Sequence, residues 1–149
     1  GEISNREFYQ EACRVFKKPV PYKMFKHYWN DIFWENPGME KLLARIKRRY
    51  PLYLISNTNA LHFTHIKREF KLLRHFKKMF PSHEVRARKP DPRIYRRVLK
   101  KIGLQPEETV FIDDMKSFVQ GARKTGMHAI RFRGLKPLTR DLQKLGIRF

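Results

Sequence analysis

The chain divides into two parts that differ in how hydrophobic and polar residues alternate. In the first fifty residues, apolar positions recur every three or four residues, which predicts amphipathic helices over residues 4–17, 22–34 and 37–49. Ser4 and Glu7 match a capping box, in which each side chain binds the backbone N–H of the other residue. This part of the chain is therefore expected to be entirely helical.

After residue 50, short apolar runs rich in β-forming residues alternate with helical stretches. Strands are expected at residues 52–55, 79–80, 110–114 and 128–132, and helices at 61–73, 94–102, 118–122 and 137–145. Strands that alternate with helices in this way are typical of a layered α/β fold with a parallel sheet.

The second predicted helix carries a stripe of aromatic residues, formed by Phe25, Tyr28, Trp29 and Phe33. Packing between helices accounts for such a stripe without any further function. A lid that covers a bound substrate is the alternative interpretation.

The composition adds a strong positive charge to this picture. Among 149 residues there are 34 Lys and Arg but only 14 Asp and Glu, so the formal net charge is +20. A charge of this size attracts anions over a long range, and nucleic acid, phosphorylated metabolites and acidic membranes are all candidates. The length itself fits one domain with a hydrophobic core.

Several classes of protein are excluded by what the sequence lacks. Cys13 is the only cysteine, so neither an internal disulfide nor a cysteine metal cluster can form, as expected for a reducing cytosol. The apolar runs are too short for a membrane span, and no leader peptide is recognisable, which predicts a cytoplasmic protein. The chain begins with Gly1 instead of Met, which suggests a fragment of a longer protein.

Polar residues follow three of the predicted strands, and these are the candidate functional residues. Ser56 and Asn57 follow the first strand, Lys89 lies in a basic loop after the second, and Asp113 and Asp114 end the third. Parallel strands bring such loops to one edge of the sheet, where ligands bind. Taken singly, Ser56 and Asn57 would suit a helix cap and Lys89 a solvated charge.

The two adjacent carboxylates suggest a metal site. Asp113 and Asp114 repel each other unless a positive group lies between them, and a hard divalent cation such as Mg²⁺ would satisfy both. A strand end followed by an acidic helix N-terminus is the alternative explanation.

Three motifs in this order resemble the haloacid dehalogenase (HAD) superfamily, and within it the small sugar-phosphate phosphatases with a helical cap. The motifs are residues 54–62 (LISNTNALH), 88–95 (RKPDPRIY) and 110–114 (VFIDD), the last followed by Gly121 and Ala122. The opening residues 1–4 are similar to a segment inside that family's cap.

The resemblance implies a Rossmann-like α/β core with a parallel sheet over residues 37–149, and a partial helical cap over residues 1–36. It also implies that Ser56 and the Asn57 backbone bind the phosphoryl oxygens, that Lys89 neutralises their charge, and that Asp113 and Asp114 hold Mg²⁺. These roles are chemically sensible, because phosphoryl transfer depends mainly on positioning and charge neutralisation.

The sequence departs from the family pattern at two places. The family's nucleophile belongs to an Asp-x-Asp motif at the end of a strand that precedes the cap, and this sequence has no such strand. Asp31, the only aspartate before Ser56, lies in the aromatic helix and is not expected to act as the nucleophile. Phe118 stands where relatives often have Asp or Asn, which puts support for the metal in question.

The leading hypothesis is a Mg²⁺-dependent phosphatase of small phosphorylated metabolites that acts through an aspartyl-phosphate intermediate, with the nucleophile absent from this chain. The chain alone would then be inactive. Either a second segment or chain completes the sheet, or the two flanking strands pair directly, or the fold is rearranged. One alternative is a 2-haloacid dehalogenase, which needs no metal and so leaves the doubled acid unexplained. Another is a non-catalytic basic module that binds nucleic acid or another polyanion.

Overall fold

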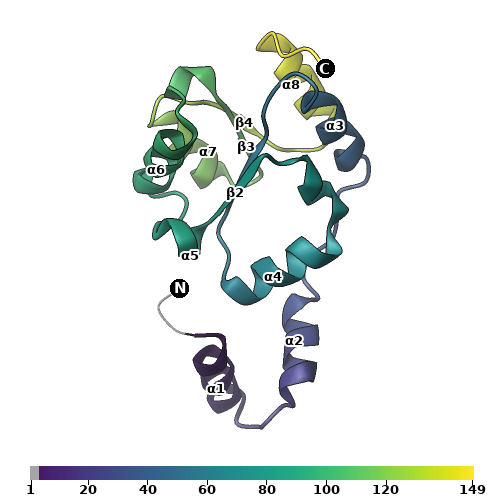
Figure 1. The fold of residues 1–149 in the computed structure, drawn as a ribbon, viewed down its shortest axis with the longest axis vertical. Helices are drawn as coiled ribbons and strands as arrows, with labels where there is room; N and C mark the ends of the chain where they lie inside the picture. The colour runs from purple at the N-terminus through teal and green to yellow at the C-terminus, as the bar shows by residue number, and fades with distance from the viewer. Residues whose placement is uncertain (1–3) are drawn as a thin grey trace.

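The computed structural model describes residues 4–149, so residues 1–3 of the predicted cap lie outside the described part. Two helices, α1 and α2, form one end of the molecule, and the remaining elements surround four short strands at the other end (Figure 1). Within the described residues, no helix is both long enough and apolar enough to cross a membrane.

The first helix begins as its sequence predicts. In α1 (Asn5–Phe16), the Glu7 N–H donates to Ser4 Oγ at 3.2 Å, and the Ser4 N–H donates to Glu7 Oε2 at 2.7 Å. These reciprocal bonds satisfy backbone donors that a helix N-terminus otherwise leaves free. The capping box is therefore confirmed.

Aromatic side chains hold α1 against α2 (Tyr22–Asn30). Measured between ring centroids, Phe25 of α2 lies 5.2 Å from Tyr9 of α1, and Trp29 of α2 lies 4.8 Å from Phe8 of α1. Phe25 and Trp29 of the aromatic stripe thus pack between the helices, as the simpler interpretation expected, whereas Tyr28 is exposed. The helix stops at Asn30 instead of continuing to residue 34, because Asp31 has left helical geometry with ψ of 42°.

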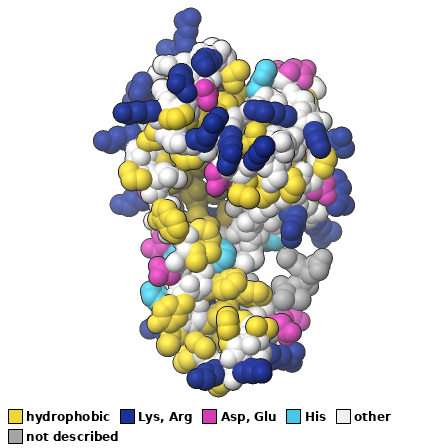
Figure 2. All heavy atoms as spheres, turned by 180° about the vertical axis from the view of Figure 1, so that it is seen from behind, with side chains coloured by type: hydrophobic (Ala, Val, Ile, Leu, Met, Phe, Trp, Pro, Cys, Tyr) yellow, Lys and Arg dark blue, Asp and Glu magenta, His cyan; other side chains and the backbone are white. Residues whose placement is uncertain are grey.

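The surface of the molecule is divided between apolar and basic side chains (Figure 2). Hydrophobic side chains gather over the end that carries α1 and α2, whereas Lys and Arg crowd the surface of the strand-containing end. Exposed apolar residues of the helical end include Val15, Phe16, Tyr28 and Trp34.

The strands are parallel, as predicted, but they form two pairs instead of one continuous sheet. β1 (Tyr53–Ser56) pairs with β2 (Lys78–Pro81), and β3 (Val110–Asp113) pairs with β4 (His128–Arg131). Among the described residues, no ladder hydrogen bonds join one pair to the other. The edges of β1 and β3 therefore remain open to a further strand.

Helices connect and cover the strands. They are α3 (Met39–Ile46), α4 (Ala60–Glu69), η1 (Lys71–His75), α5 (Ser82–Val85), α6 (Pro92–Ile102), η2 (Pro106–Glu108), α7 (Lys116–Arg123) and α8 (Leu135–Lys144). The prediction of one helix over residues 61–73 is wrong, because Phe70 adopts extended geometry and separates α4 from η1. Periodic apolar positions on both sides of Phe70 hid this break.

Two hydrophobic clusters form the core. One contains residues of β2, β3, α5, α6 and α7, and the other contains residues of α3, β4 and α8. In β4, Ala129 packs against the first cluster and Ile130 lies in the second, because neighbouring strand residues face opposite sides. The arrangement is therefore helix, strand and helix in three layers.

The α7 helix approaches the loop after residue 88 very closely at Gly121. A Cβ atom at Gly121 would lie 2.7 Å from the Pro90 carbonyl oxygen and 3.0 Å from the Tyr95 hydroxyl. Only glycine fits this contact without a shift of the backbone.

We expect Gly121→Ala to lower the free energy of unfolding by about 1–3 kcal/mol, because α7 and the Pro90 loop must move apart. Gln120→Ala is the matched control, since Gln120 is exposed on the same helix. Urea unfolding of the two variants and the parent protein measures the effect. Equal stability of the Gly121 and Gln120 variants would contradict the close contact.

Candidate active site

The predicted loops lie together at the carboxyl edge of the strands, and hydrogen bonds tie each one to its neighbour. Asn57, directly after β1, binds the backbone of Lys89 twice. Its side-chain N–H donates to the Lys89 carbonyl, and its Oδ1 accepts from the Lys89 N–H, both at 2.8 Å. The Asn57 side chain therefore fixes the loop that carries Lys89.

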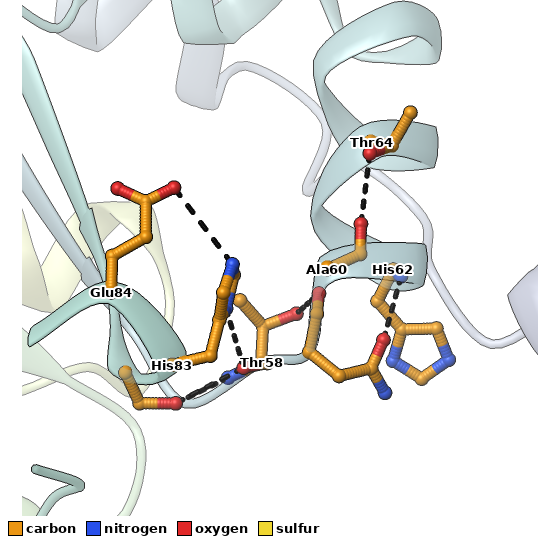
Figure 3. A network of polar contacts seen from close by, with 8 residues as sticks. Thr58, Ala60, His62, Thr64, His83 and Glu84 are labelled. Atoms are coloured by element: carbon orange, nitrogen blue, oxygen red, sulfur yellow. Dashed lines mark hydrogen bonds and ion pairs between the residues drawn. The ribbon is translucent and has the colours of Figure 1, made fainter. Parts of the chain in front are cut away.

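The loop after β1 is also hydrogen-bonded to the start of α5, directly after β2 (Figure 3). The Thr58 N–H donates to Ser82 Oγ, and the Ser82 hydroxyl donates to the Thr58 carbonyl, each at 3.1 Å. His83 Nδ1 lies 3.1 Å from the same carbonyl oxygen. These contacts fix the backbone of Thr58, directly after Ser56 and Asn57.

Lys89 joins the two strand pairs. Its ammonium group donates to Asp113 Oδ2 at the end of β3, at 2.5 Å, and to the Ile55 carbonyl of β1 at 3.1 Å. The side chains of Lys89 and Asp113 are only 8% and 9% exposed. The sequence-based expectation that these distant residues share one edge of the sheet is therefore confirmed.

Two aromatic rings complete the surroundings of the ammonium group. Lys89 Nζ lies 5.0 Å from the ring centroid of Phe118 and 5.6 Å from that of Phe111. The negative face of an aromatic ring attracts a cation, and this attraction grows when water is excluded. Phe118 is thus part of the candidate site and also packs against the core.

The acid pair presents two carboxylates in different environments. Asp113 Oδ1 accepts the Met115 N–H at 2.9 Å, so both oxygens of this buried carboxylate already have a donor. Asp114 is exposed, and its backbone carbonyl accepts from Arg131 Nε at 3.0 Å.

The carboxylates of Asp113 and Asp114 could supply some, but not all, of the ligands of a hard divalent cation. A carboxylate oxygen has a second lone pair, and Mg²⁺ is commonly held by one or two carboxylates together with water and phosphate oxygens. Among residues 4–149, no group of three or more His, Cys, Asp or Glu side chains is close enough to form a complete metal site. Further ligands would have to come from water, substrate or another segment.

A buried tyrosine lies beneath the site. The Tyr95 hydroxyl donates to the Phe118 carbonyl at 2.8 Å. Burial, together with the nearby negative charge of Asp113, raises the pKa of Tyr95 to about 12. Tyr95 is therefore a neutral hydrogen-bond donor at any physiological pH.

His62 connects the site loop to the helical end. It follows the Asn59 cap of α4, its ring stacks on Trp29 at 5.3 Å, and its Nε2 lies 3.0 Å from the Trp29 carbonyl oxygen. Figure 3 shows His62 on the first turn of α4, close to Thr58. Burial lowers the pKa of His62, which favours the neutral ring in this apolar contact.

The structure brings together the residues that the motifs singled out, and it adds some that sequence reasoning missed. Ser82, His83 and the ring contact of Phe118 had no distinctive sequence pattern. Asp31 lies at the C-terminal end of α2 and is exposed, in agreement with its exclusion as a nucleophile.

We expect Lys89→Met to destabilise the protein by about 3 kcal/mol, because the Asp113 carboxylate would stay buried without its cation. Lys89→Met combined with Asp113→Asn should recover part of the loss, since the buried charge is then gone. Chemical unfolding in a double-mutant cycle measures the coupling.

Arg93→Met is the control for that cycle. The Arg93–Asp91 pair has a similar N···O distance of 2.6 Å, but the Arg93 side chain is 67% exposed. Its loss should cost less than about 1 kcal/mol. Equal effects of the Lys89 and Arg93 substitutions would contradict a special role for burial.

The chain matches a known protein family and is similar to several curated proteins. Residues 3–132 match the haloacid dehalogenase-like hydrolase family. Over 122 residues the chain is 33% identical to the phosphorylated carbohydrates phosphatase of Thermotoga maritima, an alignment that covers 81% of this chain and 56% of that protein. It is 37% identical over 107 residues to the phosphoserine phosphatase of Thermus thermophilus, covering 68% of this chain and 42% of that one.

Solved structures agree with the sequence relatives. A HAD family enzyme of Bacteroides thetaiotaomicron in complex with magnesium superposes with a TM-score of 0.85 at 29% identity, covering 94% of this chain and 76% of that one. The wild-type enzyme with magnesium and inorganic phosphate gives a TM-score of 0.83 at 29% identity, with 90% and 71% covered. This chain spans about half the length of the curated relatives named above. Because the family match extends over most of its residues, the chain belongs to the haloacid dehalogenase-like hydrolases.

Proposed function

We propose that this chain is the greater part of a Mg²⁺-dependent phosphatase that acts on small phosphorylated metabolites. The observation that carries the proposal is the position of the Lys89 ammonium, which lies between the end of β3 and the open edge of β1. A buried cation at the edge of the sheet where ligands bind is the group needed to neutralise a phosphoryl group and the acid that attacks it.

Each residue of the site receives a role in this proposal. Ser56 and the Asn57 backbone would bind phosphoryl oxygens at the end of β1, and the Asn57 side chain positions Lys89. Lys89 would neutralise the phosphoryl group and the nucleophile. Phe118 and Phe111 exclude water from the ammonium, which strengthens its attraction for anions.

Asp113 and Asp114 are the residues that would hold Mg²⁺. The bound cation would supply charge neutralisation for the phosphoryl oxygens. Asp114 is free to bind it from the exposed side, whereas Asp113 contributes from a carboxylate that Lys89 and the Met115 N–H already orient. These two contacts hold the buried carboxylate in place.

The nucleophile is the part that this chain does not supply. The only aspartate before Ser56 is Asp31, which lies at the end of α2 in the helical end of the molecule. The edges of β1 and β3 lack a common ladder, and unpaired strand edges readily accept another strand. We propose that a separate segment or a second chain provides this strand and brings an Asp-x-Asp motif to Lys89.

The helical end, residues 1–36, would act as a partial cap on the core of residues 37–149. His62 supports this division, because it anchors the Trp29 end of α2 on the helix that follows Ser56 and Asn57. A dehalogenase remains a less fitting alternative, since its chemistry would give Asp114 no task.

Mg²⁺ binding should depend on the exposed acid. In the protein completed with its nucleophile segment, we expect Asp114→Asn to weaken Mg²⁺ binding by about tenfold or more, because a charged ligand is lost. Asp31→Asn is the matched control and should bind as the parent does. Isothermal titration calorimetry decides the question, and equal binding by both variants would refute the metal assignment.

Catalysis should require the added strand. We expect the chain alone to hydrolyse an aryl phosphate no faster than buffer with Mg²⁺, because no Asp-x-Asp motif precedes Ser56 to bring a nucleophile to the site. Joining an N-terminal segment with an Asp-x-Asp motif should produce Mg²⁺-dependent turnover.

A release assay for the phenolate product measures that turnover, with an Asn-x-Asn segment as the control. Hydrolysis by the unmodified chain that disappears in Asp114→Asn would mean that a nucleophile lies within these residues.

A further inference from the structure

A groove lies at the amino edge of the β1–β2 pair, opposite the candidate active site. One wall is formed by residues 47–52, between α3 and β1. The other is formed by residues 74–77, which are the end of η1 and the segment that leads to β2. The Lys77 N–H donates to the Leu52 carbonyl at 2.8 Å and holds the walls together. A four-residue strand, roughly 13 Å long, separates this groove from Ser56.

The groove is lined by cations from both walls. Lys47, Arg48 and Arg49 come from the first wall, and Arg74 and Lys77 from the second. Of these, only Arg74 has an ion pair within residues 4–149, with Glu40 at 2.5 Å. No acidic side chain lines the groove within the described part of the chain, so its electrostatic potential is strongly positive.

A buried histidine in the same groove has no hydrogen-bond partner. His75 is 7% exposed, and neither of its ring nitrogens forms a hydrogen bond within the described residues. The nearest acid is Glu40, with its Oε1 atom 3.6 Å from Nε2. A buried polar group without a partner is costly. Because both nitrogens are closed to solvent, the ring would turn toward the groove for a ligand oxygen to satisfy one of them.

Stabilisation of the α3 dipole explains the position of some, but not all, of the cations that line the groove. Cations at the C-terminal end of α3 interact favourably with its dipole, and Lys47, Arg48 and Arg49 lie there. Arg74 and Lys77 belong to a different segment and face the same space without serving that helix. Cations that repel one another across a groove indicate an anionic ligand.

We propose that this groove binds an oligophosphate chain of two or three phosphoryl groups, either as inorganic polyphosphate or as part of a nucleoside phosphate. Its volume of about 400 Å³ suits a small molecule better than a nucleic acid helix. Several neighbouring cations match several linked phosphates. Tyr50 and Phe76 line the same groove and offer an apolar surface to a base. This site lies apart from the proposed phosphatase site and does not depend on it.

The test is calorimetric titration of the chain with tripolyphosphate and with ATP, in EDTA so that no metal contributes. We expect binding of one molecule per chain, and Lys47→Gln with Lys77→Gln should weaken it about tenfold or more through the loss of two charge-assisted contacts. Lys23→Gln with Lys124→Gln removes the same charge from exposed positions elsewhere and should leave the affinity within about twofold.

The location is checked by NMR through the imidazole C–H signals of the histidines. Titration with tripolyphosphate should shift the His75 signals and leave those of His27, in the helical end, unchanged. Tighter binding of ATP than of tripolyphosphate would assign the ligand as a nucleoside phosphate, and equal binding as the phosphate chain alone.

Three results would overturn the proposal. They are equal weakening by both double variants, unchanged His75 signals at saturation, and binding of single-stranded RNA that tripolyphosphate does not displace. Thermal unfolding of the variants verifies that the substitutions leave the fold intact. Since no turnover and no Mg²⁺ are involved, failure here leaves the proposed phosphatase function untouched.

Discussion

A single buried ammonium group, Lys89 Nζ, links the two halves of the α/β core. The β1–β2 and β3–β4 pairs share no ladder hydrogen bonds, and Lys89 reaches from the Ile55 carbonyl of one to the Asp113 carboxylate of the other. Removing both charges from water is costly, so the pair persists only because its geometry is good and other groups complete it. The remaining contacts of the site serve to hold this ammonium where it is.

Those contacts explain why the loops can be both irregular and rigid. Asn57 binds the Lys89 backbone on one side, and Gly121 allows α7 to approach Pro90 on the other. The rings of Phe111 and Phe118 exclude water from the ammonium. A site fixed in this way needs little rearrangement when an anion arrives, which is how preorganised charges contribute to catalysis.

The fold places basic side chains at both edges of the strands. One buried cation lies at the carboxyl edge of the strands, paired with an acid. Five cations line the groove at the amino edge, and within residues 4–149 only Arg74 among them forms an ion pair. The two proposed sites would therefore take different anions: a phosphoryl group beside a metal at one edge, and a chain of phosphates at the other. The apolar surface of α1 and α2 stands apart from both (Figure 2).

The sequence by itself determined the helices, the parallel strands and the family. Ser4 and Glu7 specified a cap, the period of apolar residues specified α6 with Gly103 at its end, and the order of the polar loops placed Lys89 near Asp113. These features depend on local geometry or on a topology that parallel strands impose. Only the tertiary structure showed that β1 and β3 share no ladder hydrogen bonds with each other, that Phe70 interrupts a periodic stretch, and that the Phe118 ring faces Lys89. These outcomes depend on contacts between residues far apart in the chain, which no local pattern of hydrophobic and polar residues encodes.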